Sequence, residues 1–299
     1  MTVDITETFR KDMTDIMRGE LDSVGFDTSA IADEDLPFKY FTVSLRTIQM
    51  KPRRIEKAAG FVCPPDLQNG LAILEDRIRK GESLFPHQSK SVNRLTTEDE
   101  LLYSWSIHHF HLGDATGADG FIKRTGPVLF AYVTDDAVYM IDVKPHGSWS
   151  DKSLLQTLHD NWPELIDTWK VPGKPTVNLS SPQIAEMRKA RINTIVELAD
   201  GTSYIGPGLG ITTAGTAAEA TMKYNKIVHL MGDFIDTVKA NPEQLLQTKY
   251  TDGEIAKMNS VQFEFSLRFM PPNMIVAVDK IHGVATPFLK QLSFLRDCK

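Results

Sequence analysis

The chain is poor in cysteine and has no long hydrophobic run. Cys63 and Cys298 are its only cysteines among 299 residues, too few for a disulfide framework or a cysteine-rich zinc site. No stretch reaches the about 18 consecutive apolar residues of a membrane span, and the acidic first residues lack the pattern of a signal peptide. We therefore expect a cytoplasmic protein without a membrane partner.

An excess of positive charge is also lacking, because the chain carries a net charge of −6 at neutral pH. This balance argues against a protein that coats nucleic acid indiscriminately. The charges are unevenly distributed along the chain. Residues 1–36 hold ten acidic and three basic side chains, whereas residues 37–94 hold five acidic and eleven basic side chains. Such a basic segment can hold a polyanion, or it can be a solvated face that the acidic segment partly neutralises.

The expected elements favour an α+β fold, with antiparallel sheets built from hairpins and with flanking helices. Pairs of β-rich runs around short turns predict hairpins at 126–143, 191–205 and 261–278. Apolar residues at helical spacing predict helices over the ranges 5–18, 65–80 and 151–169, the last interrupted at Pro163.

Further local signals complete this prediction. The spacing of Thr97 and Glu100 is that of a capping box and predicts a short helix through residue 103. Thr212 or Thr213 is expected to cap a helix that runs to about residue 240. Alternating aromatic and β-branched residues over 38–48 predict a strand.

The elements group into three expected segments along the chain. These are an acidic helical segment (1–36), a histidine-rich α+β domain (37–170) and a C-terminal α+β domain (175–299), with a boundary at 170–174. Because the connection at this boundary is short, two subdomains on one continuous core stay open as an alternative.

The most distinctive feature is a concentration of histidine. Five of the eight histidines and all four tryptophans lie between residues 105 and 169; the histidines are His108, His109, His111, His146 and His159. If 105–112 is a strand, alternation places His109 and His111 on one face and His108 on the other; a helical turn would instead pair His108 with His111. His146 follows the neighbouring predicted strand. At least two imidazoles are therefore expected to converge.

Converging imidazoles suit cleavage of RNA without a metal or other cofactor. One imidazole takes the proton of a 2′-hydroxyl, another gives a proton to the leaving oxygen, and an arginine stabilises the charge on phosphorus oxygens. The predicted catalytic residues are His109, His111, Arg124 and His146. The predicted substrate-binding residues are Arg46, Arg53 and Arg54, which would hold the strand, and Tyr139 and Trp149, which would stack a base.

The same residues carry a resemblance to known proteins. Trp105-Ser-Ile-His-His-Phe-His-Leu-Gly, then Arg124, then the hairpin that ends in Asp142-Val-Lys-Pro-His146, resembles a bacterial and mobile-element family known chiefly as uncharacterised proteins. More distantly, the strand–turn–strand that ends in a histidine resembles the core of RelE-type messenger-RNA interferase toxins and their barnase-like relatives. The likeness covers about residues 100–160.

The resemblance implies a toxin or phage-defence function. It implies that His109 and His111 lie on the sheet, that Arg124 binds phosphate and that His146 acts as acid or base. The partners that it implies are RNA or the ribosome, together with an antitoxin-like protein or a second copy of the chain.

Two alternatives stay open at this point. His109, His111 and His146 with a nearby carboxylate could form the metal site of a metal-dependent hydrolase, although a His-x-His pair has little specificity. The histidines could instead be core residues that are hydrogen-bonded to backbone carbonyls in a non-enzymatic interaction or scaffold protein.

Overall fold

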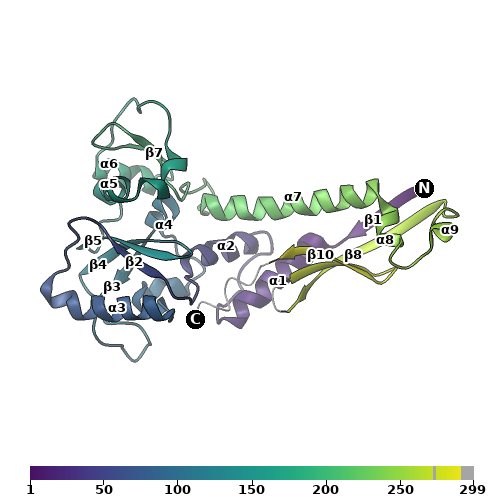
Figure 1. Cartoon of the computed structure of the whole chain (residues 1–299), viewed down its shortest axis with the longest axis horizontal. Coiled ribbons are helices and arrows are strands. Elements are labelled where there is room, and N and C mark those ends of the chain that lie inside the picture. Colours follow the sequence, from purple (N-terminus) through teal and green to yellow (C-terminus); the bar gives the residue numbers. More distant parts are fainter. Residues whose placement is uncertain (272–273, 291–299) are drawn as a thin grey trace. The chain divides into compact units, whose positions relative to one another are not determined.

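A computed structural model describes residues 1–271 and 274–290 of the chain (Figure 1). Cys298 and the predicted turn residues 272–273 lie outside the described residues. The described residues form two compact units: the first contains Met1–Phe41 together with the described residues from Met222 to Lys290, and the second contains Thr42–Thr221. The boundary expected at 170–174 lies inside the second unit. None of the helices in the described ranges combines the length and apolar character needed to cross a bilayer.

The first unit is built around a four-stranded sheet in the order β1-β8-β9-β10. Its strands are β1 (Thr2–Glu7), β8 (Ser260–Met270), β9 (Met274–Asp279) and β10 (Val284–Lys290). Only the β1–β8 pair in this sheet is parallel; the other pairs are antiparallel. The helices of this part of the chain are α1 (Phe9–Ser23), α8 (Pro242–Leu246) and α9 (Asp252–Ile255).

Two helices span the division between the units, namely α2 (Leu36–Arg46) and α7 (Ala218–Ala240). Within the first unit, the aromatic rings of α1, α7 and β8 form part of the core. The ring of Phe234 lies 5.6 Å from that of Phe9 and 5.2 Å from that of Phe265, both edge to face. Such T-shaped contacts add to the stabilisation from burial of the rings.

The second unit contains a four-stranded sheet in the order β2-β5-β4-β3 and a small hairpin. The strands are β2 (Arg54–Lys57), β3 (Ile107–His111), β4 (Pro127–Val133) and β5 (Ala137–Pro145), and the hairpin is β6 (Ile195–Glu197) with β7 (Ser203–Ile205). The α-helices are α3 (Gln68–Lys80), α4 (Glu100–Trp105), α5 (Lys152–Asn161) and α6 (Ser181–Lys189). Short 3₁₀ turns occupy Pro65–Leu67, Phe85–His87, Lys90–Asn93, Pro163–Leu165 and Asp167–Trp169.

This sheet has an apolar core on each face, with α3 on one side and α5 on the other (Figure 1). On the α3 face, Leu129 and Met140 pack against Leu74 of the helix. On the α5 face, Phe130 packs in the core that contains Leu155. Because side chains alternate along a strand, Ile107 of β3 belongs to the core on the α5 face and Phe110 to the core on the α3 face.

The strand directions decide where the site lies. β3 and β5 are both antiparallel to β4, so they run in the same direction. They therefore end at the same edge of the sheet, β3 at His111 and β5 at Pro145. Histidine side chains that are 35 positions apart in the sequence are brought to one edge by this topology.

The α+β class is confirmed, and so are the three hairpins and the helix expected over 65–80. Gly81 ends that helix in the left-handed conformation with φ 71°, which glycine adopts without strain. The helical segment after Asp151 breaks at Pro163 as expected, with α5 followed by 3₁₀ turns.

Four local predictions are wrong. Residues 38–48 fall largely in helix α2, because Leu36, Tyr40 and Val43 are buried at helical spacing and tertiary packing overrides their β propensity. Residues 2–7 form a strand, so the first helix begins at Phe9. Two caps are also misplaced.

The first misplaced cap concerns α4, where Asp99 and not Thr97 is the N-cap residue. Its Oδ1 accepts from the backbone N–H of Leu102 at 3.0 Å, and the hydroxyl of Thr97 donates to the Ser91 carbonyl. The second concerns α7, which begins at Ala218 because Thr212 instead closes a turn with Thr216.

Candidate functional site

Three imidazoles meet at the edge where β3 and β5 end. The ring centroids of His109 and His111 lie 6.5 Å apart, those of His109 and His146 6.3 Å, and those of His111 and His146 5.7 Å. The strand interpretation of 105–112 is confirmed, and His108 stacks with Phe110 on the opposite face. We call His109, His111 and His146 the histidine cluster.

His111 is the buried member of the histidine cluster and is neutral at physiological pH. Burial and the nearby Arg124 guanidinium lower its pKa to about 3. Its Nδ1 accepts a hydrogen bond from the backbone N–H of Thr125 at 3.2 Å, so the ring proton sits on Nε2. The ring can therefore donate from Nε2 to an oxygen of a ligand.

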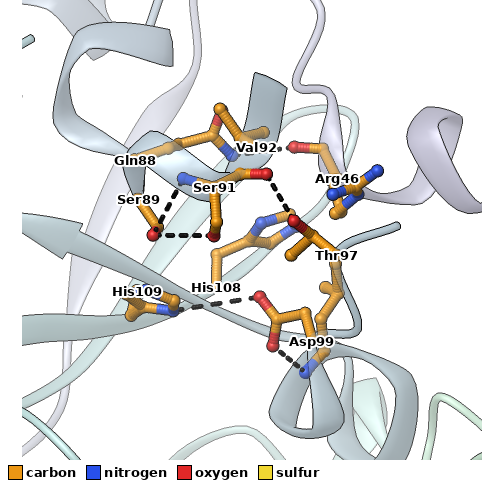
Figure 2. A pocket seen from close by; sticks show the side chains of 10 residues that line it. Arg46, Gln88, Ser89, Ser91, Val92, Thr97, Asp99, His108 and His109 are labelled. Carbon is orange, nitrogen blue, oxygen red and sulfur yellow. Dashed lines mark hydrogen bonds and ion pairs between the residues drawn. The ribbon is translucent and has the colours of Figure 1, made fainter. Parts of the chain in front are cut away.

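His109 is half-buried between the other two rings and a carboxylate. Its Nδ1 lies 4.0 Å from Oδ2 of Asp99 (Figure 2), and this nitrogen has no hydrogen-bond partner among the described residues. Burial lowers the pKa of His109, and His146 and Arg124 act in the same direction, whereas Asp99 opposes them. His109 is thus a neutral imidazole beside an anion that would stabilise its protonated form.

His146 is the exposed member of the histidine cluster, and a tryptophan borders it. The backbone N–H of His146 donates to the Gly126 carbonyl at 2.7 Å, which fixes the chain just beyond β5. The Trp149 ring lies 4.5 Å from the ring of His109 and 4.8 Å from that of His146. Trp149, predicted to stack a base, is therefore part of the site.

Arg124 is close enough to the histidine cluster to lower two of its pKa values, but its guanidinium is bound to backbone. Nε donates to the Ile122 carbonyl at 3.1 Å, Nη1 to that of Gln88 at 2.6 Å and Nη2 to that of Pro86 at 3.3 Å. Its charge can stabilise an anion in the site. That Arg124 binds phosphate directly stays a prediction, and such binding would compete with these three backbone contacts.

The predicted basic strand-binding segment is largely used by the fold. Arg53 is buried and donates to the carbonyls of Thr134 and Gln49. Arg46 is also buried, in a pocket that His108 and His109 line as well. Arg54 is exposed and pairs with Glu56 at 2.8 Å. The segment is therefore not an open basic surface.

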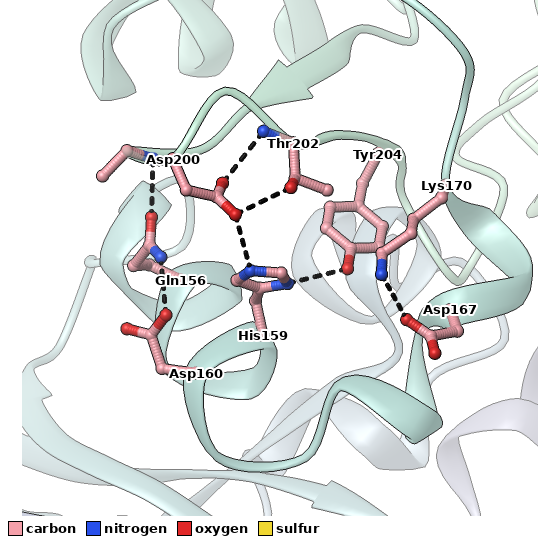
Figure 3. A network of polar contacts seen from close by, with 9 residues as sticks. Gln156, His159, Asp160, Asp167, Lys170, Asp200, Thr202 and Tyr204 are labelled. Carbon is pink, nitrogen blue, oxygen red and sulfur yellow. Dashed lines mark hydrogen bonds and ion pairs between the residues drawn. The ribbon is translucent and has the colours of Figure 1, made fainter.

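Tyr139 and His159 lie outside the histidine cluster. Tyr139 packs edge to face on Trp162, 5.1 Å between ring centroids. His159 lies in a separate network (Figure 3), where its Nε2 donates to Asp200 at 3.1 Å and its Nδ1 accepts from the hydroxyl of Tyr204 at 2.9 Å. Because Tyr204 is fully buried, this network joins α5 to the β6–β7 hairpin and has a structural role.

Three residues of the site were not found from the sequence: His87, Asp99 and Thr125. Nδ1 of the buried His87 donates to the His111 carbonyl at 2.9 Å, and burial lowers the pKa of His87 to about 4. Asp99 sits within the capping signal, but nothing in that signal points to His109. Contacts of this kind join distant segments, and no local pattern encodes them.

The metal alternative finds no support in the side-chain geometry. Within residues 1–271 and 274–290, no group of three or more His, Cys, Asp or Glu side chains is arranged to hold a metal ion. In the histidine cluster, Nδ1 of His111 is already occupied by the Thr125 N–H.

Comparison with known proteins adds no relative. No family model matches the chain, no curated protein matches it, and no solved structure matches its fold. The resemblance to interferase toxins therefore stays a prediction from the histidine motif.

Proposed function

We propose that the second unit cleaves phosphodiester bonds in RNA, with the histidine cluster as its catalytic site and without a metal ion. The observation that carries this proposal is the convergence of three imidazoles from two chain segments, between 5.7 and 6.5 Å apart, around the exposed ring of His146. A site that takes a proton from a hydroxyl and gives a proton to a leaving oxygen needs two imidazoles beside the same substrate.

Each imidazole has a distinct role in this proposal. His109, neutral because its pKa is lowered, takes the proton of the 2′-hydroxyl, and Asp99 stabilises the imidazolium that forms. The 2′-oxygen attacks phosphorus, and the bond from phosphorus to the 5′-oxygen breaks as His146 protonates that oxygen. His111 donates from Nε2 to a non-bridging oxygen. The products are a 2′,3′-cyclic phosphate and a 5′-hydroxyl.

RNA is the proposed substrate class for two reasons. The chemistry requires a neighbouring hydroxyl, which the 2′ position supplies, and Trp149 offers a face on which a base can stack. The toxin or phage-defence setting, with an antitoxin-like partner, belongs to the same proposal and is tested by growth arrest after induced expression.

The test is incubation of the pure protein with total RNA in EDTA across pH 5 to 8. We expect cleavage by the wild type, and a loss of about 100-fold or more in rate for His109→Gln and for His146→Gln. His229→Gln is the matched control, because His229 is an exposed histidine on α7 in the first unit.

Three outcomes would contradict the proposal. Absence of cleavage at every pH removes the nuclease function. Cleavage that needs added zinc or manganese favours the metal-dependent alternative. If both cluster variants lose thermal stability and the wild type has no activity, the histidines are structural, as in the scaffold interpretation.

A further inference from the structure

Arg46 is a buried cation that is only partly satisfied. It is 3% exposed, and its Nη1 donates to the Arg94 carbonyl at 3.1 Å. Its Nε and Nη2 have no hydrogen-bond partner within the residues that the structure describes, and no ion pair of Arg46 is found there. Nε and Nη2 form the edge of a guanidinium that binds two oxygens side by side. A buried charge with unmade hydrogen bonds destabilises the folded protein unless a ligand makes those bonds.

A small pocket, open in part to solvent, lies at this position (Figure 2). Arg46 lines it together with the rings of His108 and His109, the carboxylate of Asp99 and polar residues of the 88–97 segment, which are Gln88, Ser89, Ser91 and Thr97. The residues come from α2, β3 and the connection between α3 and α4, so the pocket is assembled by tertiary structure and belongs to one compact unit. We call it the Arg46 pocket.

Several polar groups of the Arg46 pocket are available to a ligand and others are not. Neither ring nitrogen of His108 makes a hydrogen bond in the described residues, and burial lowers its pKa to about 4, so the neutral ring offers one N–H. The hydroxyls of Ser89 and Ser91 are 2.9 Å apart and bond only locally. Gln88 and Thr97 donate to the carbonyls of Arg46 and Ser91 and are committed.

The single carboxylate of the Arg46 pocket is partly occupied by other groups. Oδ1 of Asp99 accepts from the N–H of Leu102, and Oδ2 faces Nδ1 of His109. Asp99 also makes no ion pair with Arg46 in the described residues. The guanidinium edge therefore stays open to an exogenous anion.

We propose that the Arg46 pocket binds a phosphate group, with two of its oxygens on Nε and Nη2 of Arg46 and others within reach of His108 and the serine hydroxyls. A tetrahedral oxyanion has acceptors in several directions, as these donors require, whereas a planar carboxylate fills only the guanidinium edge. His109 and Asp99 also line this pocket, so it adjoins the histidine cluster. Phosphate binding at Arg46 goes beyond the proposed cleavage function and does not depend on it.

Calorimetric titration of the full chain with inorganic phosphate tests the proposal. We expect saturable binding at one site and at least tenfold weaker binding by Arg46→Lys, because lysine lacks the two-donor edge. Arg77→Lys is the matched control, since Arg77 is a partly buried arginine of α3 that already donates to the Ser83 carbonyl. Its phosphate affinity should equal that of the wild type.

Parallel titrations identify the source of the phosphate group and test its geometry. If adenosine monophosphate binds more tightly than inorganic phosphate, with the same dependence on Arg46, the source is a nucleotide. If a single-stranded oligodeoxynucleotide does so, the source is a nucleic-acid strand. Acetate should bind at least tenfold more weakly than phosphate. Equal affinity for acetate would overturn the assignment to phosphate.

If Arg46→Lys does not fold, measurements on the wild type still test the proposal. Phosphate should shift the backbone amide NMR signals of Ser89, Ser91 and His108 and leave those of His111 and His146, which do not line the pocket, largely unchanged. Absence of saturable binding at about 10 mM phosphate, tenfold above a Kd of about 1 mM, would overturn the proposal. RNA cleavage is not used in any of these measurements, so failure here is separate from failure of the proposed function.

Discussion

His87 should make the stability of the second unit depend on pH. This side chain is fully buried, and its Nδ1 donates to the His111 carbonyl at 2.9 Å. Burial lowers its pKa from 6.5 to about 4. Between these two values the unfolded chain binds a proton that the folded chain does not bind, so stability falls as the pH drops from 6.5 towards 4.

The size of the effect follows from the shift in pKa. A difference of about 2.5 pKa units corresponds to about 3 kcal/mol in the free energy of unfolding between pH 7 and pH 4. His87→Asn keeps a donor near the His111 carbonyl and removes the titration. The variant should be less stable than the wild type at pH 7, and this difference should shift by about 3 kcal/mol in favour of the variant at pH 4.

Urea unfolding followed by tryptophan fluorescence measures this, because all four tryptophans lie in the second unit with His87. His108 and His111, whose pKa values are also lowered by burial, contribute to the slope of both proteins and cancel in the difference. A stability difference that is the same at pH 7 and pH 4 would refute the reasoning.

Two further predictions concern packing and substrate contact. Trp149→Ala should weaken RNA binding by about 5- to 150-fold, from about 1–3 kcal/mol of lost stacking, and Trp149→Phe should restore much of it. Equal affinity of all three proteins in an anisotropy titration would contradict this. Gly70→Ala should destabilise the protein by about 3 kcal/mol, because the new Cβ would lie 1.8 Å from the Leu112 carbonyl oxygen. Gly232→Ala, in α7 with nothing within 4 Å of the new Cβ, should instead stabilise it by about 0.5–1 kcal/mol. Similar shifts of Tm for the two glycine variants would contradict the packing argument.

The sequence predicts those parts of the fold that local chemistry determines. The β4–β5 hairpin has its turn and both β-rich runs within the 19 residues Pro127–Pro145, and Gly81 supplies the left-handed end of α3. Strand β1 could not be predicted in this way, because its hydrogen-bonding partner β8 lies far away in the sequence. Thr2 of β1 pairs with Ser260 of β8. Helix α2 escaped prediction because its β-branched and aromatic residues are held by burial.

The candidate site likewise has parts that local sequence patterns predict and parts that depend on distant contacts. Alternation along β3 correctly separates His109 and His111 from His108, and a short hairpin brings His146 to the same edge. Whether an arginine is open to solvent depends on contacts that the sequence does not show. Arg53 and Arg124 bind carbonyls from distant segments, so positive charge in a sequence segment does not by itself define a basic surface.

The most direct test of the central claim uses two oligonucleotides that differ by one oxygen atom. One is a single-stranded RNA with a mapped cleavage position, and the other carries a 2′-deoxy residue at that position only. In EDTA, the wild type should cut the first to give a 2′,3′-cyclic phosphate and should leave the second intact at that position. Equal cleavage of both, or cleavage of neither, would contradict the assignment of the histidine cluster to RNA cleavage.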